Sequence, residues 1–264
     1  MSVLETKDLT RRFGTLTAVD ALTMSVEAGE IFALLGANGA GKTVTMKMLT
    51  TLLRPSGGNA RVAGFDIVHH AAQVRRVIGY VPQLVSADGA LTGYENLLIF
   101  AKLYDIARSD RDQRIREALA FMELTEVRDK LVREYSGGMI RRLEIAAAML
   151  HRPPVLFLDE PTIGLDPIAR QAVWERIEDL RSQYGTTIVF TTHLMEEADV
   201  CTRLAIMHRG RIVTLGTPSE LKASIGGADR TMDDVFIHYA GGAVEAGGTY
   251  RETSRARRVA QRLG

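Results

Sequence analysis

Residues 31–43 read IFALLGANGAGKT, and this stretch predicts the fold of the chain. The apolar run Ile31–Leu35 is typical of a strand that is buried on both faces. The next eight residues fit the pattern G-x-x-x-x-G-K-[ST] without a gap, and we expect a helix over Thr43–Leu53, ending before Pro55. Glycines let successive backbone N–H groups face one anion, and the helix directs the positive end of its dipole to the same place. The stretch therefore predicts a phosphate-binding loop in an α/β fold.

Two further features predict nucleotide chemistry at this loop. Lys42 supplies a cation for β- and γ-phosphates, and the Thr43 hydroxyl can ligate Mg²⁺. A second apolar strand, Val155–Leu158, delivers Asp159 and Glu160 to its carboxyl end, where ligands of open α/β sheets bind. We expect Asp159 to reach the metal through water and Glu160 to orient or deprotonate an attacking water.

The remaining motifs follow in a fixed order, and together they resemble the ATP-binding subunit of ABC transporters over residues 3–225. Each motif alone has an ordinary structural explanation, so their joint order and spacing carry the resemblance. The matches are the Q-loop glutamine Gln83, the signature Tyr135-Ser136-Gly137-Gly138-Met139, the D-loop Gly164-Leu165-Asp166, the switch histidine His193, and Phe13 at the place of an adenine-stacking aromatic residue.

The resemblance implies ATP as substrate, Mg²⁺ as cofactor and an ATPase with Lys42, Glu160 and His193 as its catalytic residues. It implies metal contacts from Thr43, Gln83 and Asp159. The nucleotide-binding set is Phe13, Gly36, Asn38, Gly39, Ala40, Gly41, Lys42, Thr43, Val44, Gln83, Ser136, Gly137, Gly138 and Asp166. Two such subunits are expected to pair head to tail as a homodimer or heterodimer, with ATP at Lys42 of one chain meeting Ser136 of the other.

Three positions depart from the family pattern. Met139 replaces a glutamine and Tyr135 a leucine, while Ser136 and both glycines of the signature remain. Val44 stands where many relatives have a second hydroxyl residue, so one contact to the α-phosphate is expected to be lost. A hydrogen bond to a charged group contributes about 1.5–3 kcal/mol, enough to weaken ATP binding without abolishing it.

Details of the sequence are similar to the daunorubicin-resistance branch of the family. These details are the signature with Arg141-Arg142-Leu143-Glu144, the segment 162–167 with Arg170, and Met232-Asp233-Asp234-Val235-Phe236. That branch implies a separate ABC-2-type permease and export of a hydrophobic drug or natural product. Export of a glycan or lipid by the same permease class is an alternative. A soluble ABC ATPase of the iron–sulfur assembly type is another.

The fold class expected is an α/β P-loop NTPase core with an antiparallel β subdomain and an inserted α-helical subdomain. We place the ATP-binding domain at residues 1–225, with the helical subdomain at about 84–152. Short strands are expected over 3–35, and a capping box at Thr92 together with the stripe Ile115, Leu119 and Met122 predicts helices in the insertion. The stripe Val173, Ile177, Leu180 and Tyr184 predicts a helix that begins at Asp166-Pro167 and ends at Gly185. Residues 226–264 form a glycine-rich and then basic extension, whose end, 241–264, is expected to be mobile or to dock on a partner.

Composition narrows the class of partner. Lys and Arg number 33 against 32 Asp and Glu, so no nucleic-acid partner is expected, although the arginine-rich tail could touch nucleic acid or anionic lipid. Cys201 is the single cysteine, which fits a reducing compartment. No apolar run approaches the roughly 18–20 residues that cross a bilayer. We therefore expect the chain at the cytoplasmic face of the cell membrane, held there through a permease.

Overall fold

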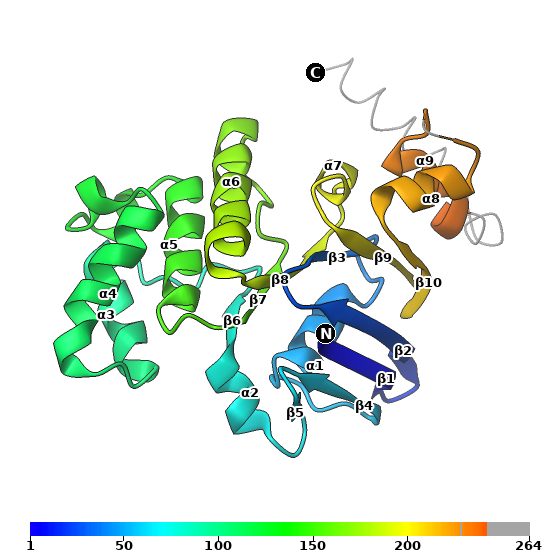
Figure 1. The fold of residues 1–264 in the computed structure, drawn as a ribbon, viewed down its shortest axis with the longest axis horizontal. Coiled ribbons are helices and arrows are strands. Elements are labelled where there is room, and N and C mark those ends of the chain that lie inside the picture. The colour runs from blue at the N-terminus through cyan, green and yellow to red at the C-terminus, as the bar shows by residue number, and fades with distance from the viewer. Residues whose placement is uncertain (228, 242–264) are drawn as a thin grey trace.

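The central sheet of the protein carries the phosphate loop. In the computed structural model, which describes residues 1–227 and 229–241, this sheet consists of β3 (Ile31–Leu35), β6 (Ile78–Val81), β7 (Val155–Asp159), β8 (Thr187–Thr192), β9 (Arg203–His208) and β10 (Arg211–Gly216). The strand order is β10-β9-β3-β8-β7-β6 (Figure 1). Neighbouring strands run parallel except β9 and β10, which form an antiparallel hairpin. The loops after β3 and β7 therefore leave the same edge of the sheet.

A second sheet is antiparallel and confirms the expected β subdomain. It consists of β1 (Ser2–Phe13), β2 (Leu16–Glu27), β4 (Gly57–Val62) and β5 (Phe65–Asp66), in the order β2-β1-β4-β5. Leu22, Met24 and Val26 are buried in β2, as their alternation predicts. The expectation of short strands is wrong here, because β1 and β2 have 12 residues each and pair along their length.

Strand β3 is buried on both faces, as its unbroken apolar run predicts. Ile31, Ala33 and Leu35 pack in one hydrophobic cluster, and Phe32 and Leu34 pack in the other. Strand β7 divides its residues between the same two clusters. Since both faces of these strands are covered, their carboxyl ends have fixed positions relative to each other.

Helix α1 (Lys42–Leu49) follows the phosphate loop but ends earlier than expected. The prediction extended it to Leu53. The backbone N–H and the hydroxyl of Thr50 both donate to the Met46 carbonyl, and Thr51 takes a left-handed φ of 65°. The left-handed Thr51 ends the helix four residues before the prediction required, and the Leu53 N–H closes it by donating to the Lys47 carbonyl oxygen at 2.9 Å.

Three helices of the region 92–152 form a group beside the central sheet, at the left of Figure 1. They are α3 (Gly93–Leu103), α4 (Arg108–Phe121) and α5 (Gly137–Met149), with 3₁₀ turns at Thr125–Val127 and Val132–Glu134 between α4 and α5. The Thr92 capping box is present, and the predicted face of Ile115, Leu119 and Met122 is buried. Helix α2 (Ala71–Val77) precedes β6.

The remaining helices are α6 (Pro167–Tyr184), α7 (Met195–Ala198), α8 (Pro218–Ser224) and α9 (Met232–Phe236), followed by a π-helical turn at Ile237–Gly241. Asp166 caps α6 and Gly185 ends it with a φ of 67°, as predicted. Tyr184 does not continue the buried stripe of this helix, because 52% of it is exposed and its ring packs edge-on against Phe121 instead. The expectation for the tail concerns residues 241–264; Gly241 ends the π-helical turn, and residues 242–264 lie outside the described part of the chain.

Within the described part, no helix combines the length and the apolar character that crossing a membrane requires.

Candidate functional site

The phosphate loop presents backbone donors to a ligand. Gly39 and Gly41 have φ values of 83° and 106°, and Gly41 opens α1 with no side chain capping the first helical N–H groups. A Cβ at Gly41 would lie 2.6 Å from the Ala18 carbonyl oxygen, so glycine is required there by conformation and by space. These uncapped N–H groups at a helix start are suited to bind an anion.

The Lys42 ammonium is folded back onto its own loop. Its Nζ donates to the carbonyl oxygens of Gly36 at 2.8 Å and Ala37 at 3.2 Å, and it lies 3.4 Å from the Glu160 Oε1. The side chain is 5% exposed. Burial lowers the pKa of Lys42, and the Glu160 carboxylate opposes that shift. The cation is thus held next to the loop by partners that a phosphate group can replace.

The Asp159 carboxylate lies at the end of β7, next to the phosphate loop. Its Oδ1 accepts hydrogen bonds from Thr43 Oγ1 at 3.2 Å and from Thr191 Oγ1 at 2.5 Å. Strand β8 carries Thr191 between β3 and β7 and so links the two site-bearing strands. A carboxylate and a hydroxyl beside a phosphate site are hard oxygen donors, the type that Mg²⁺ takes from proteins while it keeps waters and substrate phosphates. These residues fit the expected metal.

The Glu160 carboxylate is the centre of a polar cluster. Its Oε1 lies 3.3 Å from His193 Nδ1, and its Oε2 accepts a hydrogen bond from Gln83 Nε2 at 3.3 Å. Its backbone N–H donates to Thr191 Oγ1 at 3.0 Å, and its φ is 49°, an uncommon conformation for a glutamate. The fold therefore brings Lys42, Glu160, His193 and Gln83 together from segments that are distant in the sequence. A buried carboxylate among these groups can accept a proton from a water held beside a phosphate.

A cavity of about 670 Å³ opens next to this cluster. Its volume is within the range of small-molecule and cofactor sites. Phe13 lies at its rim, 43% exposed, with the Arg11 guanidinium 4.5 Å from the ring centroid. The lining residues are Phe13, Leu16, Thr17, Ala18, Asn38, Gly39, Gly41, Lys42, Thr43, Val44, Gln83, Glu160, Ile163, Arg209 and Gly210. An aromatic ring and a phosphate loop that line one cavity fit the base and the phosphates of a nucleotide.

The signature residues and the D-loop aspartate lie elsewhere in this chain. Ser136 accepts a hydrogen bond from the Met139 N–H and caps α5, while Asp166 accepts one from the Ala169 N–H and caps α6. Among the described residues that line the cavity, none is Ser136, Gly137, Gly138 or Asp166. Their roles toward nucleotide remain predictions that require a second chain.

The two substitutions in the signature have different surroundings. Tyr135 is 7% exposed, and its hydroxyl donates to the Val127 carbonyl oxygen at 2.7 Å. Met139 is half-buried and packs against the main hydrophobic cluster. Both therefore stabilise the helical group rather than alter Ser136.

Sequence reasoning missed three features near the site. The Thr191 hydroxyl donates to Asp159, but nothing in the sequence distinguishes this threonine from the other residues of its strand. Arg209 lines the cavity from the turn between β9 and β10, and no motif of the sequence marks this residue. Arg141 and Glu144 are 5% and 4% exposed on α5; charged residues three apart in an otherwise apolar helix face were the available signal.

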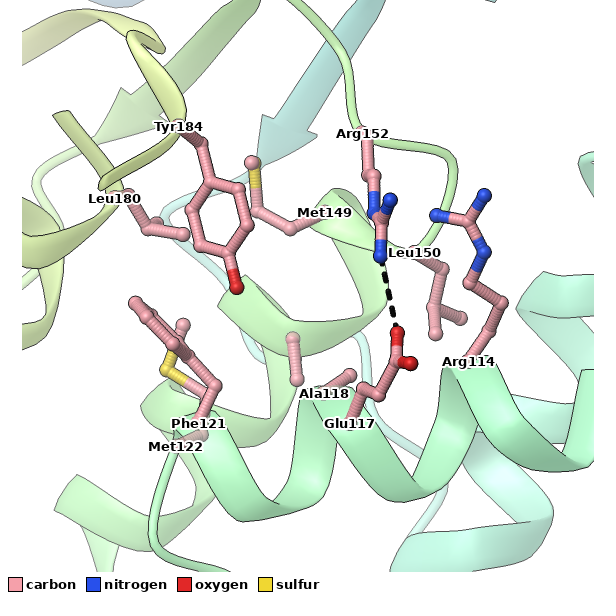
Figure 2. A pocket seen from close by; sticks show the side chains of 11 residues that line it. Arg114, Glu117, Ala118, Phe121, Met122, Met149, Leu150, Arg152, Leu180 and Tyr184 are labelled. Atoms are coloured by element: carbon pink, nitrogen blue, oxygen red, sulfur yellow. Dashed lines mark hydrogen bonds and ion pairs between the residues drawn. The ribbon is translucent and has the colours of Figure 1, made fainter.

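A much smaller hollow of about 50 Å³ lies between α4, α5 and α6 (Figure 2). Apolar side chains such as Phe121, Met149 and Leu180 surround it, and Arg152 pairs with Glu117 at 3.0 Å on its rim. The hollow is too small for a nucleotide and includes none of the motif residues. It is a packing gap of the helical group.

The fold and the site define a P-loop ATPase with an antiparallel β subdomain and a helical insertion. Comparison with known families identifies the particular family of P-loop ATPases: residues 19–163 match the family model described as ABC transporter. The chain belongs to the ABC transporter family and is an ATP-binding and ATP-hydrolysing member of it. Proteins of this family work as dimers with membrane permease partners.

Named relatives and a solved structure are similar to most of the chain. A daunorubicin/doxorubicin resistance ATP-binding protein, DrrA of Streptomyces peucetius, is 44% identical over 84% of this chain and 68% of its own length. A Nod factor export ATP-binding protein I of Burkholderia lata is 41% identical over 86% of this chain and 74% of its own length. The structure described as an ATP binding subunit of an ABC transporter has a TM-score of 0.80 at 29% identity and covers 90% of this chain and 99% of that one.

Proposed function

We propose that this chain is the ATP-hydrolysing subunit of an exporter that moves a hydrophobic drug or natural product through a separate ABC-2-type membrane permease. The observation that carries the proposal is the similarity to a daunorubicin/doxorubicin resistance protein over 84% of the chain. The intact polar cluster around Glu160 supports a hydrolytically active site. On this proposal residues 1–225 are the ATP-binding domain, with the helical subdomain at about 84–152.

On this proposal, each site residue has a separate role toward ATP, Mg²⁺ or the attacking water. Lys42 and the loop N–H groups bind the β- and γ-phosphates, and Phe13 stacks on the adenine. Thr43, Asp159 and Gln83 would hold Mg²⁺, which supplies charge neutralisation on the phosphates. Glu160 accepts the proton of the attacking water, and His193 holds that water in line with the γ-phosphate.

The position of the signature supports the head-to-tail dimer that we propose. Ser136 and the N–H groups of Gly137 and Gly138 stand at the start of α5, away from this chain's own cavity. A hydroxyl and free N–H groups at a helix N-terminus are suited to cap the γ-phosphate bound by a second unit. ATP would then join two units and hydrolysis would release them. The similarity to ATP-binding proteins of exporters supports our proposal that the chain works at the cytoplasmic face of the membrane, next to its permease.

A second candidate is the export of a glycan or lipid through the same class of permease. The similarity to a Nod factor export protein favours it, since its identity of 41% is close to that of the drug-resistance relative. The residues that bind ATP do not distinguish the two cargoes, because cargo contacts lie in the permease.

Co-purification tests the proposal. The tagged chain carrying Glu160→Gln is cross-linked in native membranes and recovered, and the proteins that accompany it are identified by mass spectrometry. Recovery of a multi-helix permease of the ABC-2 type is the expected result, and loss of that permease then tests which cargo accumulates in the cell. Recovery of soluble assembly proteins alone, such as those of iron–sulfur assembly, contradicts the exporter and favours the soluble alternative.

A further inference from the structure

Helix α5 carries a buried ion pair, and this pair also binds the segment that follows β6. Arg141 Nη1 lies 3.0 Å from Glu144 Oε2. The Arg141 guanidinium donates to the carbonyl oxygens of Pro82 at 2.8 Å and Gln83 at 3.1 Å. The Glu144 carboxylate accepts hydrogen bonds from the backbone N–H of Ser86 at 2.5 Å and from its hydroxyl at 2.9 Å. Four hydrogen bonds thus join α5 to the segment 82–86.

The pair is not explained by stability alone. Burying two charges carries a large desolvation cost, and well-packed apolar residues often replace such a pair without loss of stability. Apolar residues here would, however, leave two carbonyl oxygens and one N–H of the segment 82–86 without these partners. Arg142, the next residue, contrasts with this arrangement: it bonds the Met122 carbonyl oxygen and the exposed Glu123 and never reaches that segment.

The segment 82–86 and the signature meet through this pair. At one end, Gln83 points its amide to Glu160 in the nucleotide cavity, while Arg141 holds the backbone carbonyl of the same residue. At the other end, Ser136 caps the start of α5 only five residues before Arg141, or roughly 7.5 Å along a helix. The backbone of Gln83 is therefore hydrogen-bonded to the helix that Ser136 caps.

We propose that Arg141 and Glu144 are positioning residues that make the segment 82–86 and the start of α5 move as one body. Through them, the nucleotide state sensed by Gln83 sets how Ser136, Gly137 and Gly138 are presented to the second ATP-binding unit. This inference rests on the dimeric function proposed above and adds the residues that connect the two ends of one chain.

The experiment separates binding of ATP from formation of the dimer. Arg141→Met is introduced into the Glu160→Gln background, with Arg142→Met as the matched control. ATP affinity is measured on dilute protein, ATP-driven dimerisation by analytical ultracentrifugation, and kcat and KM in the otherwise wild-type chain. We expect Arg141→Met to change the ATP affinity and KM by less than about threefold while dimerisation weakens at least tenfold and kcat falls. In the control Arg142→Met, we expect dimerisation and kcat to stay unchanged.

Two further variants distinguish positioning from packing. Glu144→Gln keeps an acceptor oxygen for Ser86, so we expect it to weaken dimerisation less than Arg141→Met does. Glu144→Gln also replaces Arg141→Met in the test if Arg141→Met fails to fold. The exchange Arg141→Glu with Glu144→Arg keeps an ion pair but turns a carboxylate toward the Pro82 and Gln83 carbonyl oxygens, so it is expected not to restore dimerisation.

The inference is overturned if dimerisation is unchanged in Arg141→Met and Glu144→Gln, or if the exchanged pair restores it. It is also overturned if ATP affinity, kcat and thermal stability all fall in parallel, since that is a packing defect. If the protein with Glu160→Gln alone stays monomeric with ATP, the proposed dimeric function is contradicted, and the inference with it. This outcome is distinguishable because it is observed before any substitution at Arg141 or Glu144 is made.

Discussion

Glu160→Gln is the substitution that tests the assignment of the catalytic base. Glutamine keeps the shape of the side chain and the backbone bond from residue 160 to Thr191, so the cavity is retained. It removes the group that accepts the proton of the attacking water. A positioned general base contributes about 10²- to 10⁴-fold to a rate. At about 1.36 kcal/mol per tenfold, that is roughly 2.7–5.4 kcal/mol of barrier.

The same substitution acts differently on ATP binding. Lys42 Nζ lies 3.4 Å from the Glu160 Oε1. At an effective dielectric constant of about 20, Coulomb's law gives this contact a gross attraction of about 5 kcal/mol before desolvation is counted. Removing the negative charge frees Lys42 for the phosphates and removes repulsion between the carboxylate and those phosphates. Affinity for ATP is therefore expected to be equal or higher in the variant.

The assay combines steady-state phosphate release with equilibrium binding of ATP, each with Mg²⁺. Glu30→Gln is the matched control, because Glu30 is also a partly buried carboxylate paired with a cation, Arg203, but lies at the opposite end of β3. We expect turnover at least a hundredfold lower in Glu160→Gln and unchanged in the control. Turnover within tenfold of the wild type, or a large loss of ATP affinity, would refute the role given to Glu160.

Three other predictions concern single residues. Val44→Ser restores a hydroxyl at the α-phosphate and is expected to tighten ATP binding about tenfold, since a hydrogen bond to a charged group contributes about 1.5–3 kcal/mol; equal affinity in a titration of both proteins contradicts this. Phe13→Ala removes the adenine platform and is expected to raise the Kd for ATP about tenfold, the size of one base–aromatic contact, while Phe13→Tyr keeps it; similar losses in both variants would argue against stacking. Burial lowers the pKa of His151, which stacks on Tyr104, so the unfolded chain takes up a proton near its ordinary pKa that the folded chain does not. The free energy of unfolding therefore falls as the pH drops below about 6.5, and urea titrations at two pH values should show a smaller drop in His151→Gln than in the wild type.

Local patterns predicted most of the fold because they depend on neighbouring residues. The unbroken apolar run of β3, the capping box at Thr92 and the aspartate–proline start of α6 are each fixed within a few residues of the sequence, and the structure has all three. The errors at two helices have different origins. Helix α1 ends because Thr51 takes a left-handed conformation that its residue type does not predict, and the exposure of Tyr184 depends on where the helical group places Phe121.

The sequence by itself determined the motifs of the site and their order: a phosphate loop, an acidic strand end, a Q-loop glutamine, a signature and a switch histidine. Family membership follows from these alone, because the motifs occur together in one order. The tertiary structure decided which of them meet. It placed Lys42, Gln83 and His193 around Glu160, and it joined the segment 82–86 to α5 through Arg141 and Glu144. These contacts join residues up to 118 positions apart in the chain, between Lys42 and Glu160, and they form only when sheet order brings separate strand ends to one edge, so no local pattern records them.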